Sequence, residues 1–187
     1  MAEKILDFLS PTDEINSTLL KNHVHFLTGN IDENNTLEAI KWIIYENLIP
    51  ENNDLILYIN SNGGSLEDAF ALIEIMNKSK KKIKTVGLGS VCSSAFLIFA
   101  SGHKGERYIS KSSSVMCHQF SNGFDGKYHD IKSAAKENDM INQRMLSLLK
   151  KCTGLDTRTI KTKLIPPSDV WFTTEELLEL GIADNVF

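Results

Sequence analysis

The chain has 187 residues, enough for one domain with its own hydrophobic core. Its net charge of −4 argues against a nucleic-acid-binding protein, and no stretch approaches the ~20 consecutive apolar residues that span a bilayer. The 3 cysteines are widely spaced, which excludes a disulfide framework and a zinc motif of the CxxC kind. Because the N-terminus also lacks the pattern of a signal peptide, we expect a cytoplasmic location and no membrane contact.

Beyond residues 1–18, which show no clear pattern, apolar residues recur with helical or strand-like spacing. In chain order, the predicted elements are a strand at 23–29, a helix at 35–49, a strand at 54–60, a helix at 66–78, a strand at 82–89, a helix at 93–101, strands at 106–110 and 114–120, and helices at 129–152, 154–165 and 173–181. This alternation predicts an α/β domain with a largely parallel sheet.

Some of these segments carry more specific expectations. The helix at 35–49 should begin with Asn35 or Thr36 as its N-cap. Its apolar residues are expected on one buried face: Leu37, Ile40, Ile43, Ile44 and Leu48. The strand at 54–60 is almost continuously apolar, which is typical of strands covered on both faces. The lysine run at 78–84 is expected to be a solvated helix end and loop.

Residues 86–96, VGLGSVCSSAF, lead directly from a predicted strand into a predicted helix and carry several serines. A residue that opens a helix lies in the field of its N-terminus, where free backbone N–H groups can bind an anion. A serine there has the surroundings that a nucleophile beside an oxyanion hole needs. The simpler interpretation is that Ser90, Ser93 and Ser94 only cap the helix.

A nearby base would favour the catalytic interpretation, and His118 is the candidate. It lies in the otherwise apolar segment SVMCHQF, where a lone histidine is more often a core residue. The other histidines stand in polar contexts and are expected at the surface: His23, His25, His103 and His129. Composition alone does not select the carboxylate that would orient the base.

Four segments in this order resemble ClpP, the proteolytic subunit of the Clp protease and a serine peptidase: YINSNGGS, GLGSVCSSAFLIFASGHKGERY, MCHQF and DVWFTTEELLELGIAD. The resemblance implies a ClpP-like peptidase domain at 19–187, preceded by a variable N-terminal segment at 1–18. It implies an α/β fold, a ClpP/crotonase-like spiral of ββα units with a protruding handle helix.

The resemblance also implies the site residues. Ser93 falls on the nucleophile, His118 on the general base and Asp169 on the third member of the catalytic triad. The backbone amides of Gly64 and Ser94 fall on the oxyanion hole. No cofactor is implied: the chain has no GxxxxGK[ST] motif for ATP and no metal-ligand constellation.

Two neighbours of Ser93 are rivals for the nucleophile. Ser94 lies ~100° further around the helix, so both serines cannot face one site. Cys92 with a histidine would make a thiol protease, but the family has alanine there and we interpret Cys92 as a packing residue. Cys117 should point to the strand face opposite His118. Phe120 replaces a proline of the family's substrate groove, so side-chain preference is expected to differ.

The resemblance implies heptameric rings stacked in pairs, with the 129–152 helix between rings, and polypeptide substrates delivered by an AAA+ unfoldase. Apolar loops of that unfoldase would dock on Tyr58, Val86, Leu88 and Tyr108. Ser168 replaces an arginine that couples the rings, and Lys78 replaces an aromatic residue of the docking pocket. Weaker ring stacking and weaker docking are therefore expected.

Other functions compete with this one. A non-catalytic ring subunit would lack the triad residues, and an acyl-CoA enzyme of the crotonase type would not need them. A peptidase that acts without an ATPase stays open.

Overall fold

The structure, a computed structural model, describes residues 10–187, so residues 1–9 of the expected variable segment lie outside it. The main sheet has the strand order β1-β2-β3-β4-β7 and is parallel throughout. These strands are β1 (Val24–Ile31), β2 (Leu55–Gly64), β3 (Ile83–Cys92), β4 (Arg107–Ile109) and β7 (Asn185–Val186). The predicted α/β architecture with a largely parallel sheet is confirmed.

Strand β3 has two neighbours on one side. Its first half pairs with β4, and its second half pairs in parallel with β5 (Ser114–Cys117). Gly89, with φ +56, separates the halves. β5 in turn pairs antiparallel with β6 (Val170–Phe172). The sequence predicts neither β6, which has three residues, nor β7, which has two.

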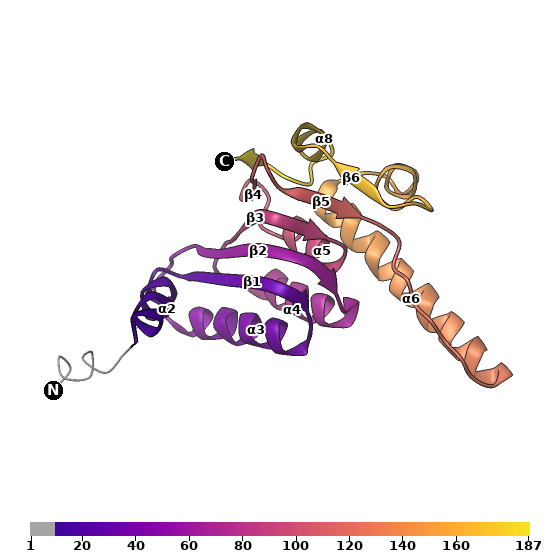
Figure 1. Ribbon diagram of the computed structural model, residues 1–187, viewed down its shortest axis with the longest axis horizontal. Coiled ribbons are helices and arrows are strands. Elements are labelled where there is room, and N and C mark those ends of the chain that lie inside the picture. Colours follow the sequence, from indigo (N-terminus) through magenta and orange to yellow (C-terminus); the bar gives the residue numbers. More distant parts are fainter. Residues whose placement is uncertain (1–9) are drawn as a thin grey trace.

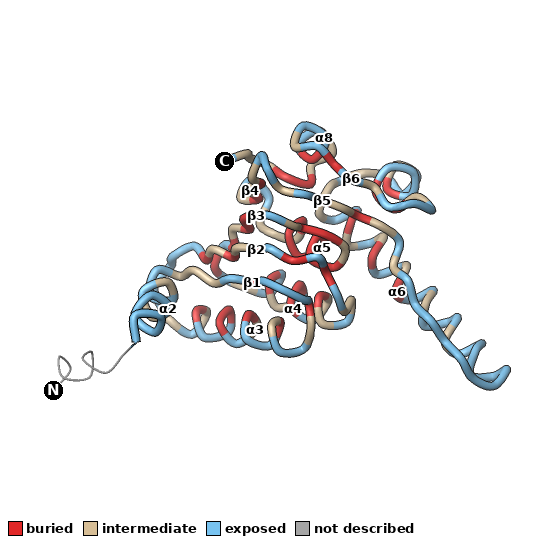
Figure 2. Tube along the Cα trace, in the orientation of Figure 1, coloured by how far each residue is buried: buried red, intermediate tan, exposed pale blue. Residues whose placement is uncertain are grey.

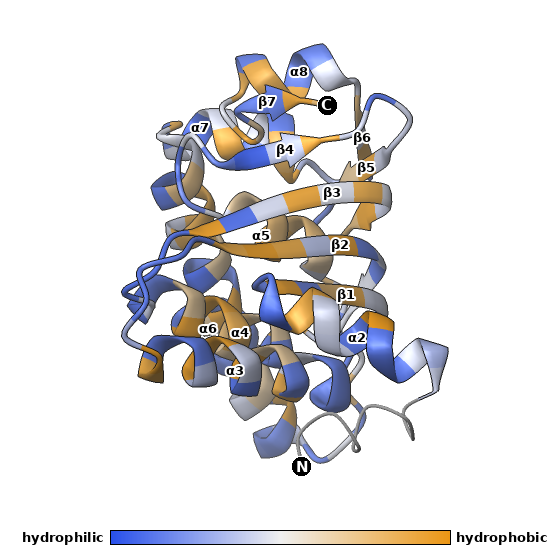
Figure 3. Cartoon of the chain, turned by 90° about the vertical axis from the view of Figure 1, so that its left-hand side faces the viewer, coloured by the Kyte–Doolittle hydropathy of each residue, from blue (hydrophilic) through white to orange (hydrophobic). Residues whose placement is uncertain are grey.

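Three helices cover one face of the sheet: α3 (Glu33–Leu48), α4 (Leu66–Lys78) and α5 (Ser94–Ala100) (Figure 1). β2 therefore alternates buried and partly exposed residues, and the expectation that both its faces are covered is wrong. This alternation is visible along β2 in Figure 2, and Figure 3 shows apolar residues concentrated in β2 and β3. α5 lies at the centre of the core, and all of its residues are buried.

The remaining helices lie outside the layer that α3, α4 and α5 form on the sheet. α2 (Pro11–Lys21), which the sequence does not predict, lies beside β1 and begins at a capping box of Ser10 and Asp13. The long helix α6 (Tyr128–Thr153) protrudes from the body as the expected handle (Figure 1). The segment expected as one helix at 154–165 contains α7 (Thr157–Thr159) and the π-helix η1 (Ile160–Leu164). α8 (Thr174–Glu179) begins at the predicted cap Thr173.

Helix α3 differs from its prediction in its cap and its buried face. It begins after Asp32, whose carboxylate accepts hydrogen bonds from the backbone N–H groups of Asn34 and Asn35. The buried face carries Thr36, Ala39, Trp42, Ile43 and Glu46. Most of the apolar residues expected inside are exposed: Leu37, Ile44 and Leu48. The helix has apolar residues on two faces, and only the sheet decides which face is buried.

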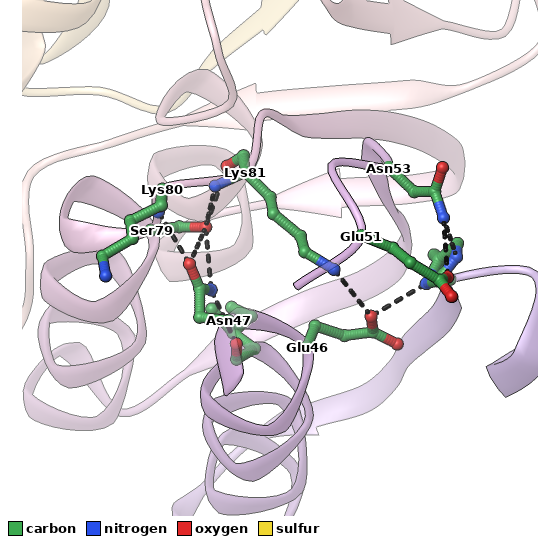
Figure 4. A network of polar contacts seen from close by, with 9 residues as sticks. Glu46, Asn47, Glu51, Asn53, Ser79, Lys80 and Lys81 are labelled. Atoms are coloured by element: carbon green, nitrogen blue, oxygen red, sulfur yellow. Dashed lines mark hydrogen bonds and ion pairs between the residues drawn. The ribbon is translucent and has the colours of Figure 1, made fainter. Parts of the chain in front are cut away.

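A buried ion pair lies at the end of α3, near the amino ends of the strands (Figure 4). The Glu46 carboxylate is 3.4 Å from Lys81 Nζ and 2.8 Å from His23 Nδ1. Glu46 is 2% exposed and Lys81 is 4% exposed. The expectation that the whole lysine run is solvated is therefore wrong at Lys81, because a buried carboxylate compensates its charge.

Three of the four histidines expected at the surface are partly buried. His23 contacts Glu46, His25 stacks on Trp42, and the Nδ1 atom of His103 accepts a hydrogen bond from the Ile83 N–H. Only His129, in the first turn of α6, is exposed. None of the helices formed by residues 10–187 is long and apolar enough to cross a membrane.

Candidate active site

Ser93 occupies the single residue between β3 and α5 and has an unusual backbone conformation. Its φ is +56° and its ψ −124°, and within residues 10–187 only His23 shares a positive φ among non-glycine residues. Such a conformation costs about 1–3 kcal/mol and persists only where the surroundings impose it. Here the Ser93 N–H donates to the Met116 carbonyl on β5, and the following helix is fully buried. The sharp turn presents the Ser93 side chain at the edge of the sheet.

His118 directly follows β5, which lies beside the end of β3. Because Cys92 pairs with Met116 in this parallel ladder, the residues after the two strands meet at the same edge. The Nε2 atom of His118 is 2.8 Å from Ser93 Oγ, a hydrogen-bond distance. The local sequence indicates both residues, and strand pairing brings them together.

Asp169 directly precedes β6, whose residue Val170 is paired with Cys117 on β5. The Oδ1 atom of Asp169 lies 3.4 Å from Nδ1 of His118, on the side of the imidazole away from Ser93. The Asp169 side chain is 57% exposed and that of His118 is 26% exposed. Three residues far apart in the sequence thus form a chain of polar contacts in the order serine, histidine, aspartate.

Two glycines end β2 next to this chain. Gly63 has φ +99, and a Cβ atom there would lie 2.6 Å from the Cβ of Ser93. Gly64 has φ +155, and a Cβ atom there would overlap the Ile31 carbonyl oxygen. Any side chain would therefore displace β2 from its neighbours. The glycines let the β2 backbone pass close to Ser93, as an oxyanion hole requires.

The two amides assigned to an oxyanion hole belong to Gly64, the last residue of β2, and Ser94, the first residue of α5. Gly64 lines the same cavity as Ser93 and His118, with a volume of about 280 Å³. Ser94 is the first residue of α5, and the first N–H groups of a helix have no partner within it. The helix N-terminus adds a partial positive charge at this point.

Ser94 and Cys92, the two alternatives to Ser93 as the nucleophile, are buried, and so is Cys117. Ser94 is fully buried, and its Oγ atom has no hydrogen-bond partner among the described residues. Cys92 is buried too, and burial raises the pKa of its thiol. Cys117 is 2% exposed, and burial raises the pKa of its thiol to about 12. Both thiols are therefore held in the protonated, unreactive form.

Several residues that line this cavity lie outside the segments that resemble ClpP. Leu66 and Glu67 come from the first turn of α4, and Ile141 comes from α6. Only Phe120, two residues after His118, is indicated by its position in the sequence. Nothing local marks Ile141, because α6 reaches the site only after the chain has folded. The Gln119 side chain donates to the Ile165 carbonyl and holds the segment after His118 against η1.

One comparison with known proteins bears on this site. The family model described as Clp protease matches residues 10–187. The match includes α2 as well as the segments whose motifs resemble ClpP. With its mostly parallel sheet, its helices on one face and its protruding helix α6, the chain belongs to the Clp protease family.

Proposed function

We propose that this chain is a serine endopeptidase and the proteolytic core of a ring-shaped ATP-dependent protease. The observation that supports this best is the 2.8 Å distance between Ser93 Oγ and His118 Nε2. A serine hydroxyl is a weak nucleophile at neutral pH, and a base within hydrogen-bond distance takes its proton as it attacks. Membership of a family of peptidases supports the same reaction.

In the first half of the reaction, Ser93 Oγ attacks the peptide carbonyl and passes its proton to His118. The backbone amides of Gly64 and Ser94 stabilise the oxyanion, and Asp169 orients the imidazole and stabilises its cation. The C–N bond breaks as His118 donates its proton to the leaving amine, and an acyl-enzyme remains. Water, deprotonated by His118, then attacks the ester; the C–Oγ bond breaks and Ser93 regains its proton.

Labelling with a fluorophosphonate probe tests the assignment of the nucleophile. We expect the probe to modify the wild type and Ser94→Ala but not Ser93→Ala. Peptide mapping of the adduct identifies the modified residue. Modification of the Ser93→Ala variant at Ser94 or Cys92 would show that the nucleophile is wrongly assigned.

We propose further that the chains assemble into heptameric rings stacked in pairs. The exposed apolar residues of α6 support this: Tyr128, Ile131 and Met140. So do those of α3: Leu37, Ile44, Tyr45 and Leu48. Apolar residues gathered on exposed helix faces are typical of interfaces between proteins. Sedimentation velocity at micromolar concentration should show a large ring assembly, and a monomer would contradict the proposal.

An AAA+ unfoldase is the partner that we propose for these rings. Tyr58, Val86 and Tyr108 are neighbours across the sheet, and the two tyrosines are partly exposed. Val86 between them is buried, so the tyrosines are the groups that a docking loop could contact. Lys78 ends α4, on the opposite side of the sheet. A docking pocket with both the tyrosines and Lys78 would therefore combine two adjacent copies of the chain.

A stand-alone peptidase ring is the second candidate, and Lys78 favours it. A strongly hydrated ammonium group at the rim of a pocket disfavours an apolar loop from a partner. A non-catalytic ring subunit is disfavoured by the short contact between Ser93 and His118. Degradation of a folded protein with and without an unfoldase distinguishes a stand-alone ring from an unfoldase-dependent one.

A further inference from the structure

The walls of the cavity in front of Ser93 differ in chemical character. Leu66, Phe120 and Ile141 form apolar walls close to the catalytic residues. Glu67, in the first turn of α4, is exposed and adds a carboxylate to the lining. It is the one acidic side chain in the lining of this cavity. Serine and asparagine side chains, Ser65, Ser121 and Asn122, complete the lining. Apolar wall segments next to a carboxylate suit a side chain with a long aliphatic stem and a cationic end.

No cationic side chain among residues 10–187 pairs with the Glu67 carboxylate, so it can bind a cationic group of a substrate. Within residues 10–187, no lysine, arginine or histidine lies within 4.0 Å of this carboxylate. Arg144 on α6 and Glu67 line a second groove, between α4 and α6, without forming an ion pair. Among residues 10–187, the carboxylate has a single hydrogen bond, a long one of 3.5 Å from Ser65 Oγ. The amino end of α4 carries a partial positive charge, but Glu67 and Asp68 outweigh it.

The position of the cavity indicates which substrate residue enters it. In the proposed reaction, the oxygen of the attacked carbonyl binds at Gly64 and Ser94. The side chain of the same substrate residue is only two bonds from that carbonyl carbon, so it falls in the space next to Gly64. In the chain, Ser65, Leu66 and Glu67 follow Gly64 and line this space.

We propose that Glu67 makes the site selective for lysine or arginine as the residue whose carbonyl is attacked. The stem of that residue packs on Leu66 and Ile141, and its cationic end meets the Glu67 carboxylate at the solvent-exposed rim. This inference rests on the proposed function, because it needs Ser93 as the nucleophile. An ion pair at such a rim raises kcat/KM for a cationic residue about twofold to fivefold over an uncharged residue of similar length.

The test uses the full chain in its assembled form and fluorogenic peptide amides that differ only in the last residue: Lys, Gln, Leu or Glu. The measured quantity is the ratio of kcat/KM for Lys to that for Gln. We expect a ratio of about two to five for the wild type, near one for Glu67→Gln, and a preference for Glu over Lys in Glu67→Lys. Glu74→Gln is the matched control. Glu74 is exposed on the same helix and lines the second groove but not the cavity, so its ratio should equal that of the wild type.

The outcomes separate the two proposals. If the fluorophosphonate probe labels Ser93 but Leu is preferred over Lys, or if Glu67→Gln leaves the Lys-to-Gln ratio unchanged, the assignment of Glu67 is wrong and the peptidase assignment stands. If the probe labels no residue and none of the peptides is cleaved, both proposals fail. High salt provides a second readout, because 0.5 M NaCl should lower the Lys-to-Gln ratio of the wild type and not that of Glu67→Gln.

Discussion

The carboxylate of Asp169 lies 3.4 Å from Nδ1 of His118 because the strands next to these two residues pair antiparallel. This pair completes a chain of contacts that starts at Ser93. The separation is longer than a charge-assisted hydrogen bond of about 2.7–2.9 Å, and Asp169 stays largely exposed.

Replacing Asp169 by Asn should lower kcat about 10²–10⁴-fold while the protein stays folded. The amide keeps the shape of the side chain but removes the charge that stabilises the imidazolium. The measurement is hydrolysis of a fluorogenic peptide, with circular dichroism as a check on folding. Ser168→Asn changes the adjacent exposed residue and should leave kcat within about twofold. Equal activities of the two variants would remove Asp169 from the mechanism.

Ser93→Ala should lower peptide hydrolysis by more than about 10³-fold. Ser94→Ala should stay active, because only the backbone amide of Ser94 takes part in the proposed reaction. It should also raise the free energy of unfolding by about 1 kcal/mol, since it removes a buried hydroxyl without a hydrogen-bond partner. Peptide hydrolysis and urea denaturation of both variants test this, and an inactive Ser94→Ala variant with an active Ser93→Ala variant would reverse the assignment.

The buried pair of Glu46 and Lys81 should matter for stability and not for chemistry. Glu46→Leu leaves the Lys81 ammonium buried without its counter-charge and should cost about 3–5 kcal/mol. The double variant Glu46→Leu with Lys81→Met should recover most of that loss, because two apolar side chains then pack together. Urea denaturation of the single and double variants gives the coupling energy, and additive effects would contradict a direct interaction.

Asp184 should contribute stability that is lost in acid. Burial opposes ionisation of its carboxylate. Two hydrogen bonds from the Arg107 side chain, the charge of Arg107, and hydrogen bonds from the backbone N–H groups of Gly105 and Arg107 together outweigh burial and lower its pKa below the ordinary value. A carboxylate whose pKa is lowered in the folded state stabilises the protein above its unfolded pKa of 3.8. This contribution disappears as the pH falls from that value through the folded pKa.

Asp184→Asn should therefore be less stable than the wild type at neutral pH, and the difference should shrink as the pH falls below about 4. Unfolding midpoints measured from pH 7 to pH 3 provide the test. The nearby exposed Glu179→Gln is the control and should show the pH dependence of the wild type. A difference between Asp184→Asn and the wild type that stays constant with pH would mean that the charge of Asp184 is not the cause.

Lys78→Phe should strengthen binding of an AAA+ unfoldase about tenfold, because partial burial of one phenylalanine contributes about 1.5 kcal/mol. The measurement is degradation of a tagged, folded protein by unfoldase and rings at equal ring concentration. Lys80→Phe is the control, on the exposed loop after α4. If the wild type degrades the substrate as fast as Lys78→Phe, Lys78 does not lie at the docking site.

Local patterns in the sequence predict the order of the main helices and strands, the junction that holds Ser93, and His118 as a histidine in an apolar strand. These features depend on the periodicity of neighbouring residues and on turn chemistry, which act over a few residues. Only the resemblance to a family indicates Asp169, because no local sequence feature distinguishes it from the other acidic residues, 24 in all.

The tertiary structure alone decided the rest. The ladders β3–β5 and β5–β6 bring Ser93, His118 and Asp169 together, and Glu67 and Ile141 reach the cavity from two separate helices. The sheet also selects which face of α3 is buried and places Lys81 against Glu46. Such contacts join residues far apart in the chain, and their free energy depends on the burial and charge that only the packed fold provides.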